Sequence, residues 1–183
     1  MHRSNNSGCT QTPTHVRRSR RMEEKNSFDL KTVKVHRTTE ATVFEVAFVI
    51  LAIIVWGIII WMIHRAPDIV PTHFDASGRP NAYGSPTGIA IPCAIITIAA
   101  LCLMVTAYFP RHINMPFKIK NIRQVELMIR QIRIAGIILL FVPLAIAYMM
   151  LGMNTPSPTP ILTVIGLLIL EILIFSILIY KAK

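Results

Sequence analysis

The sequence is poor in charged residues, and this shortage sets its class. Only 15% of the 183 residues are Asp, Glu, Lys or Arg, whereas 53% are hydrophobic. The mean hydropathy is +0.54. A soluble domain of this size would expose large apolar patches and would aggregate. The composition therefore excludes an ordinary soluble domain and indicates a membrane protein.

Acidic residues are especially few. There are nine, against 19 Lys and Arg, so the formal net charge is +10. A nucleic-acid-binding protein would gather its basic residues on one folded surface. Here long apolar blocks separate them. We therefore expect no nucleic-acid partner, and we interpret the basic residues as a signal of membrane topology.

Cysteine is scarce, and catalytic motifs are missing. Cys93 and Cys102 fall in one apolar block, where a helix would separate them by about 13.5 Å, beyond the roughly 7 Å between Cα atoms that a disulfide spans. The chain has no nucleophile elbow, no His-Glu-x-x-His pair, no phosphate-binding glycine loop and no pair of acids suited to acid–base catalysis. We expect a non-enzymatic protein with no catalytic residue, no cofactor and no metal.

Four apolar blocks dominate what is present. A helix needs about 20 apolar residues to cross about 30 Å of hydrocarbon. Glu171 interrupts the last block, but its many Leu, Ile, Phe and Val residues outweigh the cost of one carboxyl group. The sequence predicts an all-α, four-helix transmembrane bundle, and Pro143 is expected to kink the third helix. The expected spans are residues 43–63, 89–109, 134–153 and 161–180.

The basic residues alternate along the chain and predict its orientation. Nine precede the first block, two follow it, six follow the second, none follows the third and two end the chain. Loops rich in Lys and Arg stay in the cytoplasm. We therefore expect a multi-pass protein of the bacterial inner (cytoplasmic) membrane, with both termini and the loop at 110–133 in the cytoplasm.

Outside the spans, three cytoplasmic segments are expected, namely the N-terminal tail, the loop at 110–133 and the short C-terminus. Residues 1–42 are basic and polar, which predicts a disordered tail; Met22 is a second candidate start of translation, and no cleavable signal segment precedes the first span. Residues 43–153 then form a membrane domain, and residues 154–183 add the fourth span and a short cytoplasmic C-terminus.

An amphipathic helix is expected before the third span. Apolar residues recur at helical spacing beside a basic stripe. It either lies in the anionic inner leaflet or docks a protein. The apolar positions are Ile122, Val125, Ile129 and Ile132.

The loop after the first span, residues 64–88, is rich in turn signals. Asp75–Gly78 and Asn81–Gly84 each begin with Asp or Asn and end with Gly, as type I turns prefer. Ser85–Gly88 also has Pro at its second position. We expect this loop to fold into an ordered extracytoplasmic cap.

This loop also carries a family resemblance. The run IVPTHFDASGRPNAYGS at residues 69–85 resembles the signature of a bacterial membrane-domain family of unknown function, found as the N-terminal domain of Sdp-type peptide-toxin immunity proteins. Asp75 stands where that family has Asn, and residues 114–133 resemble its cytoplasmic segment. The matching positions are Pro71, His73, Phe74, Gly78, Tyr83 and Gly84.

The resemblance covers about residues 45–153 and implies a binding function. It suggests that the loop residues, Asp75 included, recognise an extracytoplasmic peptide or other ligand. Full-length immunity proteins carry a second membrane domain whose motif has no counterpart in this sequence. The resemblance therefore implies a binding or sensing protein in general, and it does not assign toxin immunity specifically.

Alternatives stay open at both candidate sites. His64, His73 and Asp75 could hold a metal, although bonding of His73 and Asp75 to the backbone of their own loop is favoured. Glu171 should face the bundle, where Thr97, Thr106, Thr163 and Ser176 could bond it. If it instead lies on a proton or ion path, the protein is a small transporter or channel-like subunit. Small residues such as Ala52, Gly57, Ala99 and Gly136 would allow close helix packing within the chain or in a homo-oligomer.

Overall fold

The computed structural model describes residues 35–75, 77, 79–113, 119–152 and 158–182. The expected tail up to residue 34, the candidate start at Met22 and the predicted site residue Gly78 lie outside the described residues.

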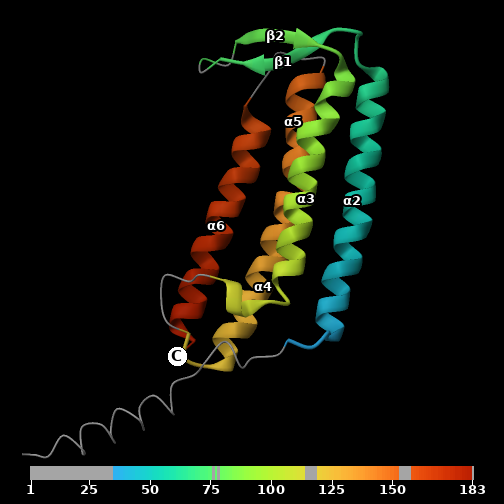
Figure 1. Cartoon of the computed structure of the whole chain (residues 1–183). Coiled ribbons are helices and arrows are strands. Elements are labelled where there is room, and N and C mark those ends of the chain that lie inside the picture. Colours follow the sequence, from blue (N-terminus) through green and yellow to red (C-terminus); the bar gives the residue numbers. More distant parts are fainter. Residues whose placement is uncertain (1–34, 76, 78, 114–118, 153–157, 183) are drawn as a thin grey trace, which may run out of the picture.

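Four long helical rods form a bundle (Figure 1). The first, third and fourth rods have 27, 30 and 23 residues. All four rods, the second included, are long and apolar enough to cross a membrane, as predicted. The third rod consists of two helices, α4 and α5, in succession. The helices are α2 (Thr39–Arg65), α3 (Ala90–Thr106), α4 (Ile122–Leu139), α5 (Phe141–Leu151) and α6 (Thr159–Lys181).

The third rod is interrupted at Leu140, between α4 and α5. Pro143 explains the break, because it has no N–H to donate to the carbonyl group of Leu139 and its ring crowds that same carbonyl group. The sequence predicted a kink from a proline in the middle of this span, and the structure has a one-residue interruption of the helix at Leu140.

The other helices pack against this third rod. Helix α5 contacts α2, α3 and α6, while α4 contacts α3 and α6. Helix α6 is the least enclosed, since only Glu171 and Ile179 of its residues are buried. The outward faces of the rods carry many exposed Ile, Leu and Val side chains. Such a surface matches lipid hydrocarbon rather than water.

The loop after α2 forms a small β-sheet, so the all-α prediction is wrong in this segment. Strand β1 (Val70–Phe74) pairs antiparallel with β2 (Pro80–Gly84), and the pair lies across one end of the bundle (Figure 1). We call this end the hairpin end, and we call the opposite end, where α2 begins and α6 finishes, the base. Val70 anchors the hairpin by packing with Val55 and Ala147 in the core.

Of the turns predicted in this loop, one is wrong and one is confirmed. The turn expected at Asn81–Gly84 is wrong, because these residues belong to β2 and Tyr83 pairs with Pro71. The turn at Ser85–Gly88 is confirmed, since the Gly88 N–H donates to the Ser85 carbonyl group at 3.1 Å. It leads into a short 3-10 helix, Pro86–Ile89, that precedes α3.

Gly136 allows α3 and α4 to approach closely. A Cβ atom at this position would lie 3.3 Å from the Ala100 carbonyl oxygen and 3.3 Å from the Met104 sulfur. At Gly57, on α2, a Cβ atom would meet nothing within 4 Å. Of these two glycines, only Gly136 is needed for helix packing within the described chain.

We therefore expect Gly136→Val to destabilise the bundle and Gly57→Val to be far milder. Valine is a better helix former than glycine, so propensity favours the substitution at both positions. Only at residue 136 does valine overpack a helix contact, at a cost of about 1–3 kcal/mol. Thermal unfolding of the two variants in detergent would measure the difference. Equal loss of stability would contradict this account of the α3–α4 contact.

Candidate functional site

Asp75 organises the turn of the hairpin. Its Oδ1 atom accepts hydrogen bonds from the Ser77 N–H at 2.9 Å, the Ser77 hydroxyl at 2.7 Å and the Arg79 N–H at 2.9 Å. The Asp75 N–H in turn donates to the Arg79 carbonyl group at 2.9 Å. The interpretation that Asp75 bonds the backbone of its own loop is confirmed.

His73 bonds across the hairpin. Its Nδ1 lies 2.5 Å from the Asn81 side-chain oxygen on the opposite strand. The imidazole donates here, since the amide oxygen accepts. The observed partner of His73 is therefore a side chain, whereas the sequence favoured a hydrogen bond to the backbone of the loop. Both residues are exposed to solvent.

The other predicted site residues are distributed over the same hairpin. Pro71 and Tyr83 are paired neighbours, as are Phe74 and Pro80 at the turn end. Tyr83 is exposed, while Pro71 and Phe74 are half-buried. Gly84 lies close to Thr72, whose methyl group would be 3.2 Å from a Cβ atom there. The predicted loop residues that the structure describes therefore belong to one hairpin.

The residues that the structure describes contain no cluster of three His, Cys, Asp or Glu suited to hold a metal ion. His64, at the end of α2, is not brought together with His73 and Asp75. Within the described chain, then, the three candidate ligands do not form a metal site.

An apolar cleft lies between α2, α5 and α6 near the hairpin end. Its volume is about 600 Å³. A smaller cavity of about 190 Å³ shares three of its residues, Trp61, Met62 and Tyr148, and adds Arg65. The lining of the larger cleft is Ile58, Trp61, Met62, Phe141, Leu144, Ala145, Tyr148, Pro160 and Val164.

Aromatic side chains give this cleft its character. Trp61 is 59% exposed and Tyr148 is 51% exposed. The Arg65 guanidinium carbon lies 5.5 Å from the centre of the Trp61 ring, within range of a cation–π interaction. From the sequence alone, Trp61 is a tryptophan near the end of the first expected span, where aromatic residues often anchor a helix at the membrane interface. The sequence could not place Tyr148 opposite, because the two residues are on helices far apart in the chain.

Glu171 faces the bundle interior, as the cost of a lipid-facing carboxyl group predicts. It is 7% exposed, and neither carboxyl oxygen has a hydrogen-bond partner among the described residues. The threonines expected to bond it do not do so. Their hydroxyls donate within their own helices, Thr97 to Cys93, Thr106 to Cys102 and Thr163 to Thr159.

Ion pairs tie the base of the bundle together. Arg37 pairs with Glu45 at 2.6 Å, and Glu45 also accepts a hydrogen bond from the Tyr108 hydroxyl. Arg130 donates to both carboxyl oxygens of Glu40, at 2.6 and 3.0 Å. The start of α2 is thereby held to the segment that follows α3 and to α4.

A second set of contacts joins α4 to the end of α6. The Asn121 side chain caps α4 by accepting from the Gln124 N–H at 2.9 Å, and its amide group donates to the Ala182 carbonyl at 2.8 Å. The buried Gln124 amide donates to the Ile179 carbonyl at 2.9 Å. The apolar side of the amphipathic helix, including Val125, packs in the same core cluster as Ile179.

Comparisons with known proteins agree with the position of the sequence motif. Residues 50–97 match the model of a domain of unknown function (DUF1648). This segment runs from α2 through the hairpin and into α3. An uncharacterized protein of the archaeon Archaeoglobus fulgidus is 34% identical over 70 residues. No solved structure matches the chain.

The match to the archaeal relative is partial on both sides. It covers 34% of this chain and 38% of the relative. Neither the matching domain nor the relative has an assigned function, so the matches support the predicted domain of unknown function. The link to peptide-toxin immunity stays a prediction from the loop motif.

We expect Asp75→Ala to loosen the hairpin and Asp75→Asn to preserve it. Alanine removes the acceptor of three hydrogen bonds, whereas asparagine keeps a side-chain oxygen that can form the same turn. By analogy with lost helix caps, the cost should be about 0.5–2 kcal/mol. Hydrogen exchange at the Ser77 and Arg79 amides would measure it.

Asp68→Ala is the matched control, since Asp68 is an exposed acid of the same loop outside the turn. If the Asp75→Ala variant kept wild-type protection of these amides, the turn would not depend on this carboxyl group.

Proposed function

We propose that this membrane protein is a non-enzymatic receptor that binds an amphipathic extracytoplasmic peptide in the apolar cleft at its hairpin end. The observation that carries the proposal is the cleft itself, about 600 Å³ and lined by apolar and aromatic side chains of three helices. Ligand sites are mostly apolar concavities of this size with a few polar groups at the edge.

The rim of the cleft suits an amphipathic ligand. Trp61 and Tyr148 present large, rigid rings that combine an apolar body with a polar tip. Arg65, stacked near Trp61, adds a charge at the edge. A peptide lying at the membrane surface would place its apolar side chains in the cleft and its polar face toward water.

In this proposal, the hairpin mainly holds the binding site in place, and only part of the hairpin contacts the ligand. Most of its polar groups are used in the turn and in the His73–Asn81 contact. Val70 joins the hairpin to a core cluster against which Met62 packs, and Met62 also lines the cleft. The exposed ring of Tyr83 is available for direct contact. Pro71, Phe74 and Asp75 would act by holding the hairpin in place.

The hairpin end is assigned to the outside in this proposal. The support is the distribution of Lys and Arg, of which only two follow the first span while six follow the second. Loops near the base are the basic ones, and basic loops remain in the cytoplasm.

Trp61→Ala should weaken peptide binding by about tenfold, because the substitution removes a large aromatic contact surface, and a tenfold change in affinity corresponds to about 1.4 kcal/mol. The measurement is fluorescence anisotropy of a dye-labelled amphipathic Lys/Leu peptide titrated with the full chain in lipid nanodiscs. Tyr148→Ala should act in the same direction.

Phe109→Ala is the control, since Phe109 is an exposed aromatic residue at the other end of the bundle. Binding that is equal for Trp61→Ala, Phe109→Ala and the wild type, or equal in empty nanodiscs, would refute a peptide site in the cleft.

A second candidate function, proton or ion transport, is favoured by Glu171. Its carboxyl group is buried without a partner among the described residues, and ionisable groups inside spans often mark ion pathways. On this alternative, Glu171→Gln abolishes proton-coupled flux in proteoliposomes, measured with an entrapped pH dye. On the receptor proposal the same variant binds peptide within about twofold of wild type, because Glu171 does not line the cleft.

A further inference from the structure

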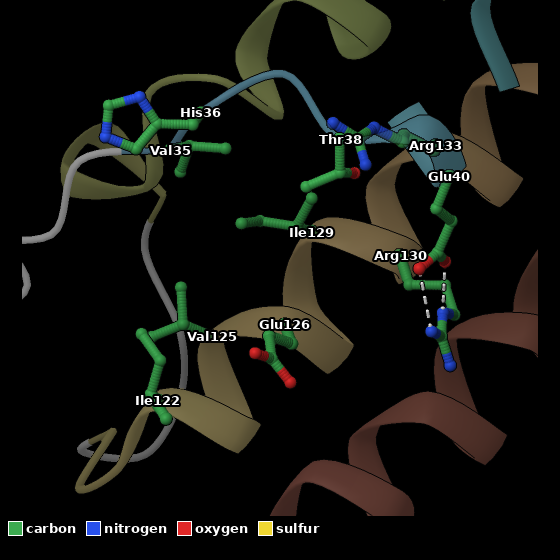
Figure 2. Close-up of a pocket in the computed structure, with 10 residues that line it drawn as sticks. All are labelled: Val35, His36, Thr38, Glu40, Ile122, Val125, Glu126, Ile129, Arg130 and Arg133. Atoms are coloured by element: carbon green, nitrogen blue, oxygen red, sulfur yellow. Dashed lines mark hydrogen bonds and ion pairs between the residues drawn. The ribbon is translucent and has the colours of Figure 1, made fainter. Parts of the chain in front are cut away.

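A second pocket lies at the base, away from the cleft. It has a volume of about 400 Å³ and lies between the start of α2 and the first turns of α4 (Figure 2). Its walls combine apolar and charged side chains. They are Val35, His36, Thr38, Glu40, Ile122, Val125, Glu126, Ile129, Arg130 and Arg133.

Arg133 is the unusual residue of this pocket. It is 4% exposed, and its Nε and Nη2 atoms have no hydrogen-bond acceptor among the described residues. Its guanidinium carbon lies 5.4 Å from the centre of the Tyr108 ring. A cation–π contact stabilises the charge, but it leaves these N–H groups without an acceptor. Buried donors of this kind normally have one.

The nearby carboxylates are already engaged. Glu40 accepts two hydrogen bonds from Arg130. Glu45 accepts from Arg37 and from Tyr108. The charge of Arg133 attracts both carboxylates electrostatically, but neither forms a hydrogen bond with it. The free donors of Arg133 therefore suit an acceptor from outside the described chain.

We infer that this pocket binds the headgroup of a phospholipid, with the phosphate group on Arg133. A guanidinium group offers paired N–H donors that match phosphate oxygens. The apolar side chains of Val35, Val125 and Ile129 provide a wall for the glycerol and the first methylenes of the lipid. The pocket lies where spanning helix α2 begins, which is the depth of lipid headgroups, and basic pockets between helices are known lipid sites.

The charges of the pocket specify the headgroup further. Arg130 and Arg133 are balanced by Glu40 and Glu126, and the Arg130–Glu40 pair is internally satisfied. Among the described lining residues, this leaves the charge of Arg133 and the exposed carboxylate of Glu126 for a ligand. A zwitterionic headgroup with a primary amine fits this pattern, with its phosphate on Arg133 and its ammonium group on Glu126. The ligand class is an aminophospholipid such as phosphatidylethanolamine.

The test is native mass spectrometry of the full chain in detergent. It is titrated separately with phosphatidylethanolamine, phosphatidylglycerol, phosphatidylcholine and inorganic phosphate. The wild type should bind phosphatidylethanolamine most tightly. Arg133→Gln should weaken that binding by about tenfold or more, since hydrogen bonds to a charged group are lost. Arg123→Gln, which removes an exposed charge from the same helix outside the pocket, should bind as wild type does.

A second pair of variants keeps the test valid if Arg133→Gln does not fold. Ile122 lines the pocket and is more than half exposed, so Ile122→Trp fills the pocket without touching the core. It should reduce lipid binding at least as strongly as Arg133→Gln. Leu162→Trp makes the same change at an exposed position near the hairpin end and should have no effect. Glu126→Gln should remove the preference for phosphatidylethanolamine over phosphatidylglycerol.

The outcomes separate the alternatives. Wild-type lipid binding by Ile122→Trp would overturn the pocket assignment, and so would wild-type binding by a folded Arg133→Gln. Phosphate that binds through Arg133 and displaces lipid would overturn the lipid assignment in favour of a free anion. Phosphatidylglycerol bound as tightly as phosphatidylethanolamine would overturn the role of Glu126. These results do not bear on the peptide cleft, which lies at the other end.

Discussion

The close packing of the α4–α5 rod is the constraint on which the rest of the structure depends. This rod contacts α2, α3 and α6, and Gly136 brings α3 close to it. In hydrocarbon, apolar side chains gain nothing by leaving lipid, so helices associate through close contact and hydrogen bonds rather than by the hydrophobic effect. Helix α6 packs on the α4–α5 rod with few buried residues and leaves a cleft open beside α5.

The polar groups are arranged according to depth along this bundle. At the hairpin end they fix a turn, as Asp75 does with the Ser77 and Arg79 amides. At the base they form ion pairs that tie helix ends together. Both positions are close to water, where charge is inexpensive, whereas Glu171 lies between them. Arg133 and Glu171 carry buried polar atoms without hydrogen-bond partners among the described residues, and they are therefore the groups that call for a functional explanation.

The hairpin shows why local sequence signals were only partly sufficient. Asn81 and Gly84 fit a type I turn by spacing, but Asn81 contacts His73 on the other strand and Tyr83 pairs with Pro71. Strand pairing depends on residues about ten positions away, and short turn patterns do not contain that information. The turn at Ser85–Gly88 was predictable, because its hydrogen bond closes within four residues.

The sequence by itself determined the four apolar helices and the break near Pro143, since these follow from hydropathy and from a missing N–H group. It also determined that Glu171 faces inward, because a lipid-facing carboxylate is too costly. Only the tertiary structure decided that Trp61 and Tyr148 share a cleft. It also decided that Arg133 is buried beside Tyr108, with two of its nitrogens lacking an acceptor among the described residues. Those arrangements depend on which helices are neighbours and how they are rotated. That choice is made by the packing of many side chains together, and no single segment encodes it.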